Sequence, residues 1–98
     1  MVKHIVVWKL ADTEDKEKKA LEIKRNLEAL KDEIPQICDI QVGINFNETE
    51  NASDIVLVST FKSREDLNAY IVHPAHQAAG SKYVRPNVTE RRVADYEY

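Results

Sequence analysis

Cysteine, glycine and proline are scarce in this 98-residue sequence, which has one, two and three of them respectively. The single cysteine, Cys38, cannot form an intramolecular disulfide, and no second thiol is available for a cysteine-based metal site. With so few chain-breaking residues, we expect mostly regular secondary structure with short connections. A chain of this length forms about one domain, here residues 1–98.

Long apolar runs and an excess of basic residues are also absent. The apolar run within residues 1–9 is too short for a signal peptide or a membrane span, so we expect a cytoplasmic protein with no membrane partner. The 14 basic and 17 acidic residues are well mixed and give a formal net charge of −3. Because no basic stripe is present to bind a phosphate backbone, the sequence argues against nucleic acid as a partner.

The apolar periodicities predict the element order β-α-β-β-α-β. The predicted strands span residues 2–10, 38–46, 55–61 and 89–98. An amphipathic helix follows the first strand and ends at Pro35, and a shorter helix capped by Ser63 follows the third strand. His73-Pro74 interrupts that shorter helix, and the next helical turn is expected to stop at Gly80. This order predicts an α+β, ferredoxin-like protomer with its helices on one face of an antiparallel sheet.

The first and third predicted strands carry apolar side chains on both faces. In residues 2–10 the even positions share one face, while Ile5 and Val7 lie on the other. Helices can cover only one face of such a sheet, and an apolar face left in water usually marks an interface. We therefore predict a homodimer in which the sheet face packs against the sheet of a second copy.

The densest group of reactive side chains lies between Tyr70 and His76 and includes His73, and the third histidine is His4. Tyr70 and His73 are three residues apart, as are His73 and His76, so helical turns can bring two of them onto one face. Four interpretations stay open: structural packing, a metal site, acid–base catalysis, and ligand binding without turnover. The three histidines have no obvious carboxylate partner and no His-Glu-x-x-His motif, so we expect no metal and no cofactor.

Acid–base catalysis would use a histidine together with a tyrosine. A histidine with a pKa near 6.5 can remove a proton, and a buried tyrosine hydroxyl can polarise a carbonyl. Such a pair suits proton abstraction beside a carbonyl, as in an aldol or enolisation step, with a small carbonyl or aromatic compound as the ligand. Covalent catalysis is less attractive, because Cys38 has no partner nearby in sequence and no Gly-x-Ser-x-Gly elbow is present.

Four segments of the chain together resemble the stress-responsive α/β-barrel (Dabb) family. They span residues 2–9, 61–67, 70–76 and 93–97 and include the His-Pro-x-His element and a terminal Asp-Tyr. The resemblance covers nearly the whole chain. It implies a ferredoxin-like protomer whose sheet pairs with that of a second protomer to form a dimeric α/β barrel.

Members of this family of the olivetolic acid cyclase type are cofactor-free polyketide cyclases. Their acid–base pair lies in the same Tyr-x-x-His-Pro-x-His element, so by resemblance the catalytic roles would fall on Tyr70 and His76. His4 would match a pocket histidine on the first strand, and we take His4 and His73 as candidate substrate-binding residues. Those cyclases carry a further histidine on the third strand, where this chain has Ile55, so we expect a different substrate.

Three functional hypotheses therefore follow from the sequence. The first is a stress-responsive α/β-barrel homodimer of unassigned activity with a small-molecule pocket. The second is a cyclase-like or related acid–base enzyme that uses Tyr70 and His76. The third is a non-catalytic protein whose role is structural self-association.

Overall fold

The fold is built from four strands and three helices, as described by a computed structural model of all 98 residues. The strands are β1 (Val2–Leu10), β2 (Asp39–Ile44), β3 (Ile55–Phe61) and β4 (Val88–Glu97). The helices are α1 (Lys16–Glu28), α2 (Arg64–Val72) and α3 (Pro74–Ala79), with short helical turns η1 (Ala29–Asp32), η2 (Gly80–Val84) and η3 (Arg85–Asn87). With α2 and α3 as the interrupted second helix, the predicted ferredoxin-like α+β fold is confirmed.

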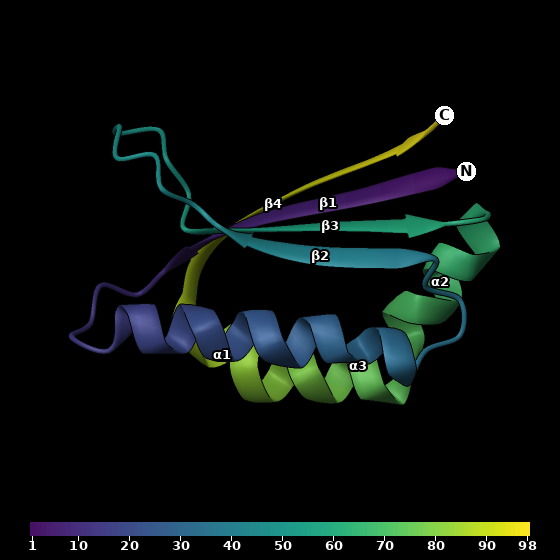
Figure 1. The fold of residues 1–98 in the computed structure, drawn as a ribbon, viewed down its shortest axis with the longest axis horizontal. Helices are drawn as coiled ribbons and strands as arrows, with labels where there is room; N and C mark the ends of the chain where they lie inside the picture. Colours follow the sequence, from purple (N-terminus) through teal and green to yellow (C-terminus); the bar gives the residue numbers. More distant parts are fainter.

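The four strands form one antiparallel sheet in the order β2-β3-β1-β4, so β1 lies between β3 and β4. Figure 1 shows the helices together on one side of this sheet. In this register His4 lies opposite Ser59 on β3 and opposite Asp95 on β4. Directly opposed residues share a face of the sheet, so the side chains of His4 and Asp95 both belong to the helix-covered side.

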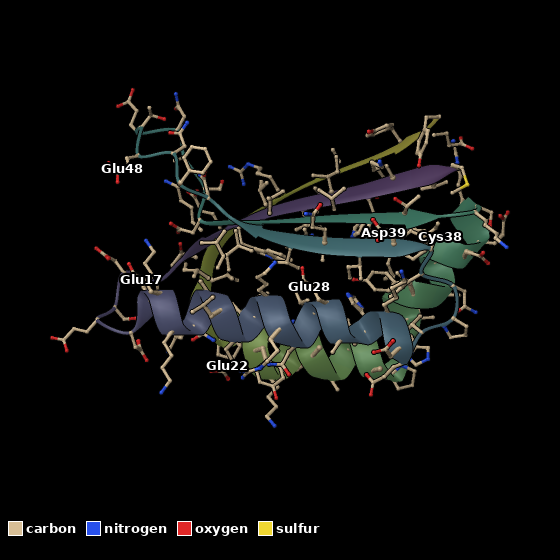
Figure 2. The ribbon with its side chains drawn as sticks, viewed as in Figure 1. Glu17, Glu22, Glu28, Cys38, Asp39 and Glu48 are labelled. Carbon is tan, nitrogen blue, oxygen red and sulfur yellow. The ribbon has the colours of Figure 1, made fainter.

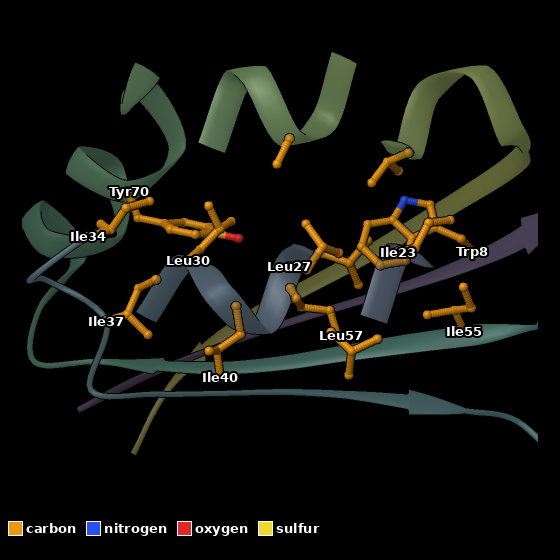
Figure 3. Packing of buried hydrophobic residues seen from close by; sticks show 14 of the residues in the cluster. Trp8, Ile23, Leu27, Leu30, Ile34, Ile37, Ile40, Ile55, Leu57 and Tyr70 are labelled. Carbon is orange, nitrogen blue, oxygen red and sulfur yellow. The ribbon is translucent and has the colours of Figure 1, made fainter. Parts of the chain in front are cut away.

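The core lies between the helices and the covered face of the sheet (Figure 3). The even residues of β1 and the odd residues of β3 are buried there, as alternating side chains on a half-covered sheet should be. From the helix side, α1 and η1 contribute the predicted apolar stripe, which includes Ala20, Ile23, Leu27 and Leu30. This packing holds the sheet and the helices at a fixed spacing, which determines the room left for a cavity.

The edge strand β2 is held to α1 by a charged pair. The Glu28 carboxylate accepts hydrogen bonds from the Val42 backbone N–H at 3.0 Å and from Lys24 Nζ at 2.9 Å. Lys24 Nζ also donates to the Val42 carbonyl. Figure 2 shows Glu28 between α1 and β2, whereas Cys38 lies at the start of β2. Backbone groups that an edge strand would leave unpaired are thus partly satisfied by the helix.

The opposite face of the sheet carries no helix, and its apolar side chains are only half-buried. Ile5 and Val7 on β1 and Val56 and Val58 on β3 all lie on this open face. Ala94 on β4 pairs with Ile5 and is exposed. The two-sided apolar character that the sequence predicts for β1 and β3 is therefore confirmed. Within the chain, none of the helices combines the length and apolar character that a membrane crossing requires.

One detail differs from the sequence-based expectations. Gly80 ends α3, but the chain does not leave the helical region there, because Gly80 has φ −61° and ψ −45° and η2 continues to Val84. The expectation that the helical turn stops at Gly80 was therefore wrong. The glycine within β2, Gly43, lies in a continuous β2–β3 register, and a Cβ at this position would lie 3.2 Å from Val56 Cγ1, so the two strands approach closely here.

Candidate functional site

A break between α2 and α3 places the Tyr70–His76 segment over the sheet. Ser63 begins α2 by accepting a hydrogen bond from the Asp66 N–H, as predicted. His73 then adopts an extended backbone, as residues before proline favour, and Pro74 occupies the first turn of α3. The chain turns at this point, so that His76 comes back to the last turn of α2. Its Nδ1 lies 2.9 Å from the Ile71 carbonyl oxygen.

The aromatic rings of Tyr70 and His76 are in contact, with centroids 4.4 Å apart and planes at 44°. His4 approaches Tyr70 edge-on at a centroid distance of 6.1 Å. Phe61 also packs against Tyr70, with ring centroids 5.1 Å apart. Three side chains that the sequence singles out for acid–base chemistry therefore form one cluster, although they come from β1, α2 and α3.

This cluster borders a cavity of about 160 Å³ between the helices, β1 and β4. The cavity is lined by His4, Trp8, Leu27, Leu57, Tyr70, His76, Gly80, Val84, Arg85, Val88 and Arg91. An apolar cavity of about 150 Å³ can hold a benzene molecule, so this space suits a ligand of that size. Larger surface hollows of about 510 and 550 Å³ flank the loop after β2, but no histidine, tyrosine or cysteine lines them.

His76 is set up as a neutral base. A carbonyl oxygen only accepts hydrogen bonds, so the contact with Ile71 requires the proton of a neutral His76 to be on Nδ1 and leaves the lone pair on Nε2. Burial lowers the pKa of His76 below its usual 6.5, and the positive charges of His4, Arg91 and Arg85 lower it further, against the opposing effect of the Ile71 hydrogen bond. The imidazole is thus unprotonated at neutral pH, the state in which it can take up a proton.

Tyr70 is set up as a neutral donor. The side chain is only 1% exposed, and Figure 3 shows it extending inward between the helices and the sheet. Burial raises the pKa of Tyr70 to about 12, with the charge of Arg91 acting in the opposite direction. Its hydroxyl keeps its proton at neutral pH and makes no hydrogen bond to another group of the chain. That proton is therefore available to a ligand oxygen.

His4 is positioned by a residue that the sequence does not single out for the site. Its side chain is buried, at 4% exposure, and its Nδ1 lies 2.5 Å from Asp95 Oδ1. A carboxylate that accepts from Nδ1–H fixes the orientation of an imidazole ring. The two partners are 91 residues apart in the chain and meet because the β1–β4 register places them opposite each other.

Unlike the other two histidines, His73 does not line the cavity. Its Nδ1 accepts a hydrogen bond from the Ala75 N–H at 3.0 Å and so caps the start of α3. This geometry favours a positioning role for His73, since the break that it caps directs His76 toward Tyr70. In the whole chain, no three His, Cys, Asp or Glu side chains come together as a potential metal-ligand set.

Comparisons with known proteins agree with this architecture. The sequence matches the family described as "Stress responsive A/B Barrel Domain" (Dabb) over residues 2–98. A comparison with curated proteins finds no match. Among solved structures, a dimeric protein of ferredoxin-like fold from Bacteroides fragilis NCTC 9343 is 38% identical, with a TM-score of 0.89 over 99% of this chain and 95% of that chain.

More distant structures share the fold. A dimeric ferredoxin-like protein from Jannaschia sp. CCS1 is 27% identical, with a TM-score of 0.78 over 99% of this chain and 98% of that chain. A hydroxynitrile lyase from Passiflora edulis is 17% identical, with a TM-score of 0.74 over 97% of this chain and 90% of that chain. The protein therefore has a ferredoxin-like fold of the kind found in these dimeric proteins. It belongs to the Dabb family.

Proposed function

We propose that this protein is an acid–base enzyme that moves a proton on a small carbonyl compound held in the cavity between the helices and the sheet. The observation that carries the proposal is the contact between a neutral histidine, His76, and a protonated buried tyrosine, Tyr70, on the wall of one cavity. The class of chemistry is that of an enolisation or an aldol-type cyclisation. A hydroxynitrile lyase shares this fold, so the fold also houses a lyase in another protein.

The reaction needs one proton donor and one proton acceptor on the same substrate. Nε2 of His76 takes a proton from the carbon beside the carbonyl, and the electron pair of the broken C–H bond moves into the carbonyl to form an enolate. The Tyr70 hydroxyl donates a hydrogen bond to the enolate oxygen, where the negative charge collects. The protonated His76 then returns its proton, either to the same carbon or, in an aldol step, to the new alkoxide. We assign substrate binding to His4, which is held by Asp95 and lines the same cavity.

Hydrogen–deuterium exchange tests this step without knowledge of the natural substrate. Two probes, acetophenone and 4-methyl-2-oxopentanoate, would be incubated with the protein in D₂O, and loss of the C–H signal beside the carbonyl followed by NMR. The native protein is expected to accelerate exchange of at least one probe, and His76→Asn to reduce that acceleration about 10²-fold or more. Exchange by His76→Asn at the native rate, or no acceleration by the native protein with either probe, would contradict the proposal.

The working unit in this proposal is a homodimer formed through the open face of the sheet. Ile5, Val7 and Val58 present half-buried apolar surface there, which a second sheet would cover. Three similar structures are described as dimeric proteins, which supports this arrangement. The family is described as stress-responsive, so the proposal includes a role of this protein in stress response.

Sedimentation at micromolar concentration tests the dimer. Val58→Lys places a charge in the middle of the open face and is expected to give a monomer. Leu21→Lys is the matched control, because Leu21 is an exposed leucine on α1, away from that face. A native protein that sediments as a folded monomer would contradict the dimer.

A further inference from the structure

We propose that the cavity selects an anionic ligand, a small carboxylate with a compact apolar body, and that Arg91 and Arg85 bind its carboxylate. This inference deepens the proposed function, and it rests on that proposal for the identity of the cavity as the site. Nothing in the sequence singles out these two arginines, which are exposed residues among the 14 basic residues of the chain.

The two arginines reach the cavity from different elements. Arg91 is on β4, directly opposite Trp8 of β1, and therefore shares the helix-covered side of the sheet with it. Arg85 is in η3, which follows η2, and Gly80 and Val84 of η2 also line the cavity. Both line the cavity together with His76 and Tyr70. Both residues thus border the space that holds the proposed acid and base, and their charges act on His76.

Neither guanidinium is neutralised by the protein. No salt bridge of the structure includes Arg85 or Arg91, and the one side-chain contact of Arg85 is from Nη1 to Ser81 Oγ at 3.3 Å. No aspartate or glutamate lines the cavity. The nearby carboxylate of Asp95 is already hydrogen-bonded to His4. Two unpaired cations therefore border a cavity without a lining carboxylate, in a chain whose net charge is −3.

The effect of this charge reaches the proposed catalytic pair. Arg91 and Arg85 both lower the pKa of His76, after the larger effects of burial and of His4, and Arg91 also lowers the pKa of Tyr70 against the larger effect of burial. An anion bound between the two guanidiniums would offset this positive charge. Arginine forms paired, charge-assisted hydrogen bonds with carboxylates, so a carboxylate is the anion that this geometry recognises best.

The rest of the wall sets the shape of the ligand. Its apolar side chains come from both the sheet and the helices and are those of Trp8, Leu27, Leu57, Val84 and Val88. A volume of about 160 Å³ accommodates a body the size of a single ring. The recognised compound therefore combines one carboxylate with a ring-sized apolar group, which describes benzoate as a minimal probe.

Trp8 allows a direct binding measurement, because it is the only tryptophan of the chain and it lines the cavity. The native protein would be titrated with benzoate and with benzamide, which has the same shape and no charge. Tryptophan fluorescence and titration calorimetry would follow each titration. We expect saturable benzoate binding that is about tenfold or more tighter than benzamide binding. This comparison requires no variant and so does not depend on the folding of one.

Charge-matched variants then locate the anion. Arg91→Gln and Arg85→Gln are each expected to weaken benzoate binding about tenfold and to leave benzamide binding unchanged. Arg25→Gln is the control, since it removes the same charge from an exposed position on α1 that is outside the cavity. Arg91→Lys keeps the positive charge but lacks the paired N–H donors of a guanidinium group, and it should bind benzoate better than Arg91→Gln does.

The outcomes separate this inference from the proposed function. Equal affinity for benzoate and benzamide, absence of benzoate binding, or equal weakening by Arg25→Gln and Arg91→Gln would overturn the inference, whatever the exchange assay shows. Selective benzoate binding that survives in His76→Asn supports the inference even if no proton exchange is catalysed. In that last case only the proposed function would fail.

Discussion

Removal of the Tyr70 hydroxyl is expected to separate stability from activity. In Tyr70→Phe the buried ring stays and its packing against Phe61 and His76 is retained. The hydroxyl that is lost has no hydrogen-bond partner in the chain. The folded protein therefore loses no internal hydrogen bond, whereas the proposed reaction loses the donor to the enolate oxygen.

The two magnitudes follow from burial and from the role of the donor. The Tyr70 side chain borders the cavity, and its hydroxyl is not among the fully buried polar atoms that lack a partner, so its removal breaks no bond within the chain and leaves no group unpaired. We therefore expect the free energy of unfolding of Tyr70→Phe to stay unchanged or to shift by at most about 1 kcal/mol. For a domain of this size, the larger value corresponds to about 4–8 °C in Tm. The exchange rate should fall about 10²-fold, as when one donor to a developing oxyanion is removed.

Urea unfolding and the deuterium-exchange assay measure these two effects on the same sample. Tyr83→Phe is the control, because it removes the same atom from a partly buried tyrosine on η2 that does not line the cavity. It should leave proton exchange at the native rate. A Tyr70→Phe variant that is clearly destabilised and exchanges at the native rate would refute the reasoning, because Tyr70 would then be a structural residue.

Three further predictions concern charged groups. Exchange should slow as the pH falls through the depressed pKa of His76. The free energy of unfolding should decrease below pH 6.5, because the unfolded chain binds that proton more readily. Both pH profiles should change in His76→Asn. Burial raises the pKa of Glu28, but hydrogen bonds from Val42 N–H and Lys24 outweigh burial and lower this pKa below its usual 4.5. In urea unfolding, Glu28→Gln should therefore lose part of the stability difference between neutral and acidic pH. Asp95→Ala should lower the free energy of unfolding by about 1–2 kcal/mol in urea, because buried His4 loses its partner. A decrease no larger than that of the exposed-residue control Asp12→Ala would contradict this prediction.

The sequence predicted the fold well because its periodic patterns report on which face of an element is covered. Alternation from Val2 to Leu10 identified β1 and its two apolar faces, and the stripe through Ile23 and Leu27 identified α1. The fit of Pro74 to a helix start located the break between α2 and α3. Each of these signals lies within a short stretch of consecutive residues.

The candidate site depended on information that is not local. Asp95 meets His4 only through the register of two strands from opposite ends of the chain. In the sequence, Arg85 and Arg91 are indistinguishable from other exposed basic residues. Only the three-dimensional structure shows that η3 and β4 bring them to the cavity. His73 is three residues from both Tyr70 and His76, so spacing alone does not exclude it from the site. Its ring nevertheless caps the start of α3, because the backbone is extended at the break before Pro74.

The comparison of His76→Asn with His73→Asn tests the central claim most directly. Both variants remove an imidazole from the same short segment, and asparagine can still cap α3 at position 73. We predict that His73→Asn accelerates deuterium exchange beside the probe carbonyl nearly as well as the native protein, while His76→Asn falls to a rate near that of the solution without protein. Equal exchange rates for the two variants would contradict the assignment of His76 as the base.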